Sequence, residues 1–163
     1  MKKVTIIGLL LLGSAYANAD VTRYPLPNNS TFPIAQAVEV SANTTLVYHS
    51  GTLPSPANPD AEQGSREYWG DTEAQANSVF ENMSASLENL GLDFGDVVKM
   101  TVFLVGDPEM DGRMDFGGFM KAYSKHFGTA AQPNKPARSA IQIAALARPH
   151  VFVEVEVVLA RPE

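Results

Sequence analysis

The stretch from Val151 to Leu159 alternates two kinds of side chain with a period of two. Valine stands at every second position from 151 to 157, and the positions between hold Phe152, Glu154, Glu156 and Val158. Successive residues of a strand point to opposite faces of a sheet. One face of this strand is therefore apolar and the other carries two carboxylates, which favours a sheet that is covered on one side only.

Two amphipathic helices are predicted, and they would cover that side. The first runs from Asp71 as N-cap to Gly91 at the C-terminal cap, with apolar residues at helical spacing. The second begins at Phe116 and extends to Phe127, and its apolar positions step by three or four residues.

Four more strands are predicted, over residues 37–40, 45–50, 96–105 and 137–143. The first two flank a turn at 41–43, and the third is the central strand because it is the densest β-rich run. The order is ββ-α-β-α-ββ, so we expect an α+β fold with a single sheet and two helices packed on one face.

The first 19 residues have the pattern of a signal peptide. Lys2 and Lys3 precede a short apolar run, and Ala17-Asn18-Ala19 forms an A-x-A cleavage site. We therefore expect removal of residues 1–19, an extended lead-in over 20–31 and one domain over 32–163. The protein would be exported, periplasmic or secreted, with no membrane anchor after cleavage.

Charge and composition narrow the function classes. Loss of Lys2 and Lys3 leaves 10 basic against 18 acidic residues, a net charge of −8 instead of −6. Such a chain repels phosphate backbones and has no basic stripe, so we expect no nucleic-acid partner. It contains no cysteine, which excludes disulfides, thiolate catalysis and cysteine-based zinc sites.

The sequence predicts no metal site. The acidic loop 107–115 matches the first positions of an EF-hand loop, but the required glutamate at its twelfth position is Gly118. The three histidines, His49, His126 and His150, have no ligand spacing and fall in different elements.

One pair of residues suggests chemistry. Arg138 opens a predicted strand and could clamp a carboxylate with two parallel N–H bonds, beside a strand end such as Ser50-Gly51. Glu154 could hold or deliver a proton in a partly dry pocket. The alternative is that Glu154 lies on a solvent face and Arg138 forms a surface ion pair.

At these residues the sequence resembles the RidA (YjgF) family. The resemblance covers about residues 32–160 and rests on the following segments: Ser50-Gly51-Thr52-Leu53-Pro54, the helix 72–90, the strand 95–104, Tyr123 with Phe127, Pro136-Ala137-Arg138-Ser139, and Val153-Glu154-Val155-Glu156. It implies a chorismate-mutase-like fold and a homotrimer, in which the sheets form a central barrel with three clefts between subunits.

The resemblance also implies hydrolytic deamination of reactive 2-imino and enamine acids to 2-keto acids and ammonia, as in a 2-iminobutanoate/2-iminopropanoate deaminase. No cofactor or metal is implied. Arg138 would bind the carboxylate of a small ligand, and Ser50 and Gly51 would line the pocket. Glu154 would orient the attacking water or exchange protons with it.

Three positions depart from the family pattern. Ile34 stands where the family has a tyrosine, Met120 where it has an asparagine, and Ala140 where it has a cysteine. Each change makes the expected substrate cleft more apolar. The loop 54–70 is longer than usual and carries Trp69, which would either close over the cleft or pack down its own loop.

Two functions remain open. The first is the deaminase, supported by Arg138 with Glu154. The second is a non-catalytic trimeric binder of small carboxylates, which the three lost polar groups and export from the cytoplasm favour. A third, ribonuclease activity, is disfavoured by the acidic charge.

Overall fold

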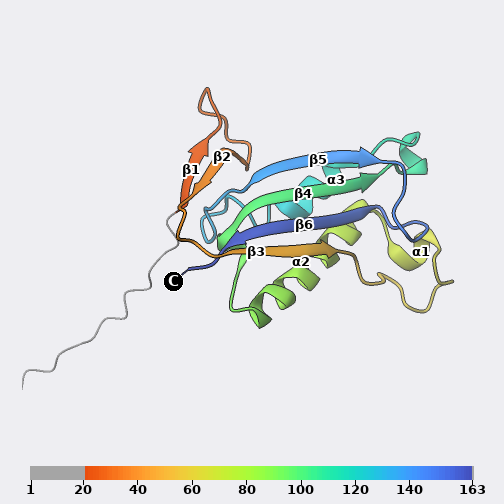
Figure 1. The fold of residues 1–163 in the computed structure, drawn as a ribbon. Coiled ribbons are helices and arrows are strands. Elements are labelled where there is room, and N and C mark those ends of the chain that lie inside the picture. The colour runs from red at the N-terminus through yellow and green to blue at the C-terminus, as the bar shows by residue number, and fades with distance from the viewer. Residues whose placement is uncertain (1–20, 163) are drawn as a thin grey trace, which may run out of the picture.

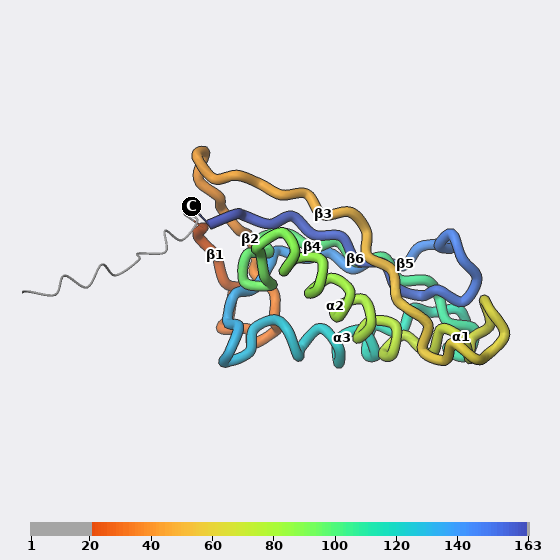
Figure 2. Tube along the Cα trace, turned by 90° about the horizontal axis from the view of Figure 1, so that it is seen from below, coloured from red at the N-terminus to blue at the C-terminus, as the bar shows by residue number. Residues whose placement is uncertain are grey.

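The computed structural model describes residues 21–162 as one mixed sheet with two main helices (Figure 1). The strands are β1 Val21–Pro25, β2 Ala35–Val40, β3 Leu46–Thr52, β4 Val97–Val105, β5 Ala137–Ile143 and β6 Val153–Ala160. The helices are α1 Arg66–Trp69, α2 Thr72–Asn89 and α3 Phe116–Tyr123, with 3₁₀ turns η1 Phe94–Asp96 and η2 Pro108–Met110. Helices α2 and α3 lie side by side on the same face of the sheet (Figure 2), so the predicted α+β fold class is confirmed.

The sheet has the order β1-β2-β5-β4-β6-β3. Strand β4 is central, parallel to β5 and antiparallel to β6, while β3 forms one edge and the β1–β2 hairpin the other. The two predicted strands around residues 41–43 exist, but they do not pair with each other. Strand β2 pairs with β1 and β5, and β3 crosses to pair with β6.

The N-terminal segment adds a strand to the predicted order. Residues 21–25, within the predicted extended lead-in, form β1, and the polar residues that follow make the hairpin loop. Asn28 and Asn29 adopt φ values of 59° and 55°, a left-handed conformation that asparagine tolerates better than most residues. The predicted signal peptide, 1–19, lies outside the described residues.

The core lies between the sheet and its two helices. Its strand side comes from alternate residues of β4 and β6, all almost fully buried: Met100, Val102, Leu104, Val153, Val155, Val157 and Leu159. The helix side comes from Val79, Phe80, Met83, Leu87, Phe119, Ala122 and Tyr123, joined by Phe127. Each such large side chain stabilises the fold by about 1.5–3 kcal/mol when fully buried.

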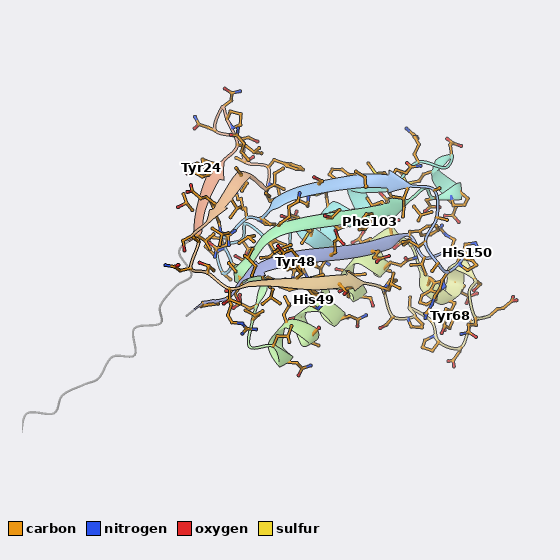
Figure 3. The ribbon with its side chains drawn as sticks, in the orientation of Figure 1. Tyr24, Tyr48, His49, Tyr68, Phe103 and His150 are labelled. Atoms are coloured by element: carbon orange, nitrogen blue, oxygen red, sulfur yellow. The ribbon has the colours of Figure 1, made fainter. Side chains whose placement is uncertain are left out.

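The opposite face of the sheet is open. Tyr48 and Phe103 belong to it (Figure 3), because their strand neighbours alternate with them on the buried side. The side chain of Tyr48 is 77% exposed, and Leu46 and Ile141 are also exposed. A single subunit therefore leaves apolar surface on this face.

The long loop 54–70 is fixed to the body and not free. Arg66 of α1 donates to both carboxylate oxygens of Asp107, at 2.7 and 3.0 Å, and His150 Nδ1 lies 2.9 Å from the Gly64 carbonyl. Trp69 is only 4% exposed. This burial favours the second of the two predicted roles, in which Trp69 packs its own loop against the body.

The acidic loop 107–115 is organised by the same ion pair. Asp107 is buried and caps η2 through the Glu109 N–H. The hydrogen bonds from Arg66 hold the pKa of Asp107 below its ordinary value. Its oxygens are thereby taken by hydrogen-bond donors, and no group of three or more metal-ligand side chains occurs within residues 21–162.

Candidate functional site

Arg138 lies in a cage of aromatic rings. It stands opposite Met100 in the β4–β5 register, so its side chain shares the helix-covered face. The centre of its guanidinium lies 4.2 Å from the Tyr123 ring centroid, and 5.5–5.7 Å from those of three phenylalanines: Phe32, Phe116 and Phe119. Cation–π attraction to these rings fixes the direction of the guanidinium.

The Arg138 guanidinium has few hydrogen-bond partners within the described chain. Its Nη1 donates to the Met120 sulfur at 3.2 Å, the Tyr123 hydroxyl is a further hydrogen-bond partner, and no described carboxylate forms a salt bridge with it. Burial lowers the pKa of Arg138 and raises that of Tyr123. A half-buried cation with unused N–H donors is suited to a planar anion such as a carboxylate.

The three departures from the family pattern all fall on this side of the sheet. Met120 contacts Arg138 directly. Ala140 follows Arg138 by two residues on β5 and shares its face, and Ile34 follows Phe32 and Pro33 of the cage segment. All three are partly buried against the core, so the surroundings of Arg138 are apolar.

Gly51 and Glu154 form a second cluster. At Ser50-Gly51, β3 contains a bulge, since His49 pairs with Val157 but Thr52 pairs with Val155. A Cβ atom at Gly51 would collide with the Glu154 carboxylate. Only glycine lets the carboxylate approach the backbone so closely, and among residues 21–162 no hydrogen bond to the Glu154 carboxylate is formed.

The two clusters lie on opposite faces of one subunit. Arg138 shares the face of Met100, whereas Glu154 pairs with Phe103 on the open face, three residues further along β4. The structure therefore brings Gly51 to Glu154 and Met120 to Arg138, while Ser50 lies beside Gly51 in the bulge and Ile34 follows Phe32 by two positions. It does not join Arg138 to Glu154 within one chain.

A polar row on α2 holds the end of β3 that carries Gly51. Asn82 Nδ2 donates to the Leu53 carbonyl at 3.0 Å, and Ser86 Oγ lies 2.8 Å from His49 Nε2. Residues four apart share one helix face, so this row holds His49 of the edge strand and Leu53 just after its end. This row was not predicted from the sequence, because single polar residues on a helix do not indicate their tertiary partners.

The aromatic cage was not predicted from the sequence. Phe116, Phe119 and Tyr123 have helical spacing and were predicted only as part of an apolar helix face. Phe32 has no periodic neighbours, and its place beside Arg138 depends on the hairpin loop between β1 and β2.

No helix within the described residues is long and apolar enough to cross a membrane.

Comparison with known proteins gives consistent matches. The profile of a family described as Endoribonuclease L-PSP matches residues 28–161. A RutC family protein of Haemophilus influenzae is 34% identical over 129 residues, which cover 79% of this chain and 87% of that protein. The Escherichia coli protein named "Putative reactive intermediate deaminase TdcF" is 30% identical over 129 residues, with coverage of 79% and 87%.

Among solved structures, the fold is similar to that of YyfB, a Rid family protein of Yersinia pestis. The TM-score is 0.62, and the match covers 85% of this chain and 98% of that chain at 21% identity. At this level of identity the likeness concerns the fold alone.

Proposed function

This chain belongs to the family described as Endoribonuclease L-PSP, whose members carry the names RutC and Rid, and from this premise we propose that it hydrolyses reactive 2-imino and enamine acids to 2-keto acids and ammonia. The observation that carries the proposal is the caged guanidinium of Arg138, which has unused donors and no carboxylate partner among residues 21–162. A relative whose name includes reactive intermediate deaminase supports the reaction class.

Arg138 binds the substrate carboxylate. Two parallel N–H bonds fix the plane of the carboxylate and so the orientation of the adjacent imine carbon. The rings around the guanidinium exclude water from its faces, which strengthens the pairing because the local dielectric is lower. The substrate side chain then lies against apolar residues such as Ile34 and Met120.

Glu154 acts as the general base and then the general acid. A water molecule adds to the imine carbon while the Glu154 carboxylate accepts its proton, and the proton is then returned to the nitrogen. In the resulting carbinolamine, Glu154 then transfers the hydroxyl proton to the nitrogen as the carbon–nitrogen bond breaks, so that ammonia leaves and the carbon–oxygen double bond of the 2-keto acid forms. The reaction transfers no electrons, and neither a metal nor an organic cofactor takes part.

The site is completed by a second copy of the chain. Arg138 and Glu154 lie on opposite faces of one sheet, so we propose a homotrimer in which the Arg138 cluster of one subunit faces the Gly51–Glu154 cluster of its neighbour. The exposed apolar residues of the open face, Leu46, Tyr48 and Ile141, support burial of that face on assembly.

A non-catalytic binder of small carboxylates is the second candidate. Ile34, Met120 and Ala140 cannot orient a water molecule, and this favours binding without turnover. Ribonuclease activity, which the family description names, has less support because the chain carries a net charge of −6.

We also propose export, with cleavage after Ala19. The support is the sequence of residues 1–19 alone: two lysines, an apolar run and the A-x-A site. Amino-terminal sequencing of protein recovered from outside the cytoplasm should begin at Asp20. A mature chain that retains Lys2 and Lys3 would contradict the proposal.

Ammonia release from freshly generated 2-imino acids tests the reaction. Wild-type protein should accelerate release above the uncatalysed hydrolysis, Arg138→Ala should abolish the acceleration, and exposed Arg113→Ala should leave it unchanged. Glu154→Gln should retain ligand affinity and lose about a hundredfold in kcat. Binding of 2-keto acids with no acceleration by the wild type would establish the binder in place of the enzyme.

A further inference from the structure

The β1–β2 hairpin has few links to the rest of the sheet. Strand β2 meets β5 at a single register position, Ala35 opposite Ala137, and the Ala35 N–H donates to the Pro136 carbonyl at 2.9 Å. Figure 1 shows the hairpin set at an angle beside the start of β5. Its position therefore depends on side-chain contacts.

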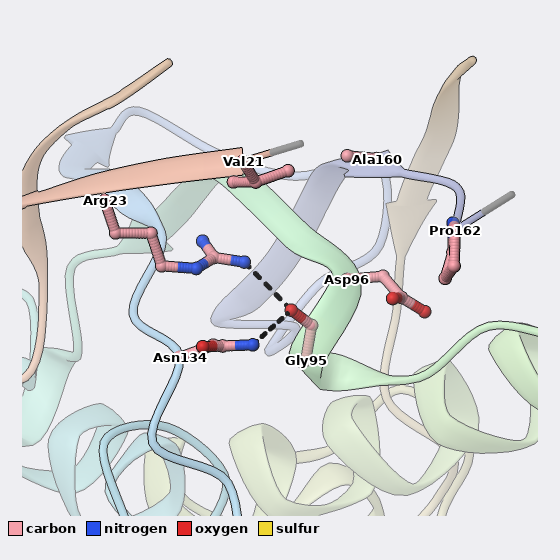
Figure 4. Close-up of a pocket in the computed structure, with 7 residues that line it drawn as sticks. All are labelled: Val21, Arg23, Gly95, Asp96, Asn134, Ala160 and Pro162. Atoms are coloured by element: carbon pink, nitrogen blue, oxygen red, sulfur yellow. Dashed lines mark hydrogen bonds between the residues drawn. The ribbon is translucent and has the colours of Figure 1, made fainter. Parts of the chain in front are cut away.

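Arg23 of β1 supplies most of the polar contacts that fix the hairpin. Its Nη1 donates to the carbonyls of Val97 and Lys135, at 3.0 and 3.2 Å, and its Nη2 donates to that of Gly95, at 2.9 Å. Asn134 donates to the same Gly95 carbonyl at 3.0 Å (Figure 4). The guanidinium is half-buried beside a hollow of about 460 Å³.

The accepting carbonyls belong to segments that lead into the core strands. Gly95 and Val97 flank the junction of η1 with β4, and Lys135 precedes Arg138 by three residues. Arg23 thus ties three separate parts of the chain together: the hairpin, the start of β4 and the segment that enters β5.

The hairpin carries one wall of the Arg138 cage. The Phe32 ring lies 5.5 Å from the Arg138 guanidinium, and the next residue, Pro33, accepts a hydrogen bond of 2.7 Å from the Tyr123 hydroxyl. A shift of the hairpin would move Phe32 away from Arg138 and strain that bond.

We propose that Arg23 is a positioning residue of the Arg138 site: through three backbone carbonyls it fixes both the hairpin that carries Phe32 and the entry to the strand that carries Arg138. This inference rests on the proposed function only for the identity of the ligand. A lysine cannot reproduce the contact, because one ammonium cannot reach three divergent carbonyls as a planar fork does.

Calorimetry on the full chain tests this role. Arg23→Met should weaken 2-ketobutyrate binding about fivefold or more, and Arg23→Lys should give an intermediate loss. Arg161→Met is the matched control, since Arg161 also donates to a backbone carbonyl, that of Leu90 at 2.9 Å, but forms no hydrogen bond to the hairpin or to the segment that enters β5. It should bind as the wild type does.

A double-mutant cycle separates positioning from general stability. Phe32→Ala should weaken binding in the wild-type background and have a smaller effect in Arg23→Lys, although the two residues do not touch. Additive effects would overturn the proposal, as would unchanged affinity in Arg23→Met or an equal loss in Arg161→Met.

An NMR measurement keeps the test independent of the ligand. The Arg138 Nε–H resonance, identified by its absence in Arg138→Lys, should shift in Arg23→Lys and stay in place in Arg161→Met. If the wild type binds no 2-keto acid, the ligand role of Arg138 fails, while this resonance still decides the role of Arg23. An unmoved resonance would refute it.

Discussion

At the scale of single residues, Arg138 is a half-buried cation that has no anionic partner within the described chain. A guanidinium is costly to bury without an anion, yet here four rings and a thioether replace the missing carboxylate. The rings cover its faces, and its edges remain able to donate. The sequence predicted the arginine but not the cage, because ring positions on a hairpin and a helix reveal nothing about their distance in space.

Removal of the Arg138 guanidinium should lower the affinity for 2-keto acids. Hydrogen bonds to charged groups contribute about 1.5–3 kcal/mol, so Arg138→Ala should weaken binding of a 2-keto acid roughly tenfold or more. Arg138→Lys should recover part of this, because an ammonium lacks the planar fork. Isothermal calorimetry measures both variants, with Arg113→Ala as control, and an unchanged affinity in Arg138→Ala would rule out the anchor role.

Apolar neighbours of Arg138 should set the preference for the ligand side chain. Ile34 and Met120 offer no hydrogen bond, so each further methylene that becomes buried should contribute about 0.8 kcal/mol. A ligand hydroxyl in the same place should lose affinity, because it leaves water without a new partner. Competition binding with 2-keto acids of increasing chain length measures the trend. Flat affinity, or tighter binding of a hydroxyl-bearing member, would contradict it.

His126 should make stability sensitive to acid. Its ring packs 5.0 Å from both Phe80 and Phe94, and burial, with help from Lys125, lowers its pKa below 6.5. The unfolded chain therefore binds a proton more readily, so stability is complete above about pH 6.5 and falls as the pH drops through the lowered pKa. Urea unfolding of His126→Phe should show a weaker decline between pH 7.5 and 5 than the wild type, and equal declines would exclude this role.

At the scale of elements, the sequence pattern correctly predicted those helices and strands that are determined by interactions between neighbouring residues. The helix from Asp71 to Gly91 and the strand β4 were predicted because helix capping and hydrophobic periodicity depend on residues close together in the sequence. Strand β1 was missed because prolines and asparagines around it indicated irregular chain, and only pairing with β2 makes it a strand. The pairing partners of β2 and β3 depend on tertiary packing, which no local pattern contains.

The bulge between β3 and β6 makes a prediction for Gly51. An alanine there would place its Cβ on the Glu154 carboxylate, so either the carboxylate or the strand must move. Gly51→Ala should therefore lower the unfolding free energy by about 1–3 kcal/mol and reduce kcat further than Glu154→Gln does. In Glu154→Ala the clash disappears, and Gly51→Ala should then cost much less stability. Equal costs in the two backgrounds would show that the close approach is unimportant.

At the scale of the whole molecule, the placement of the two clusters bears directly on assembly. One chain holds Arg138 on the covered face and Glu154 on the open face. Rearrangement within the sheet cannot join them, because a one-residue slip would also turn the valines of β6 out of the core. Under the proposed function, the site would be completed by a neighbouring chain, and the exposed Tyr48 lies on the face that would be covered on assembly.

Light scattering on the mature protein should accordingly give a mass close to three times that of one mature chain. Tyr48→Asp should shift the protein toward monomers, because a carboxylate on the open face would be buried without a partner in the trimer, while the subunit itself should stay folded. Met110→Asp, a similar change at an exposed loop position, should leave the trimer intact. Ammonia release should fall in Tyr48→Asp in proportion to the monomer fraction, since a monomer lacks the facing Gly51–Glu154 cluster. A monomeric variant with full activity would mean that one chain completes the site alone, and the two-cluster account of catalysis would then be wrong.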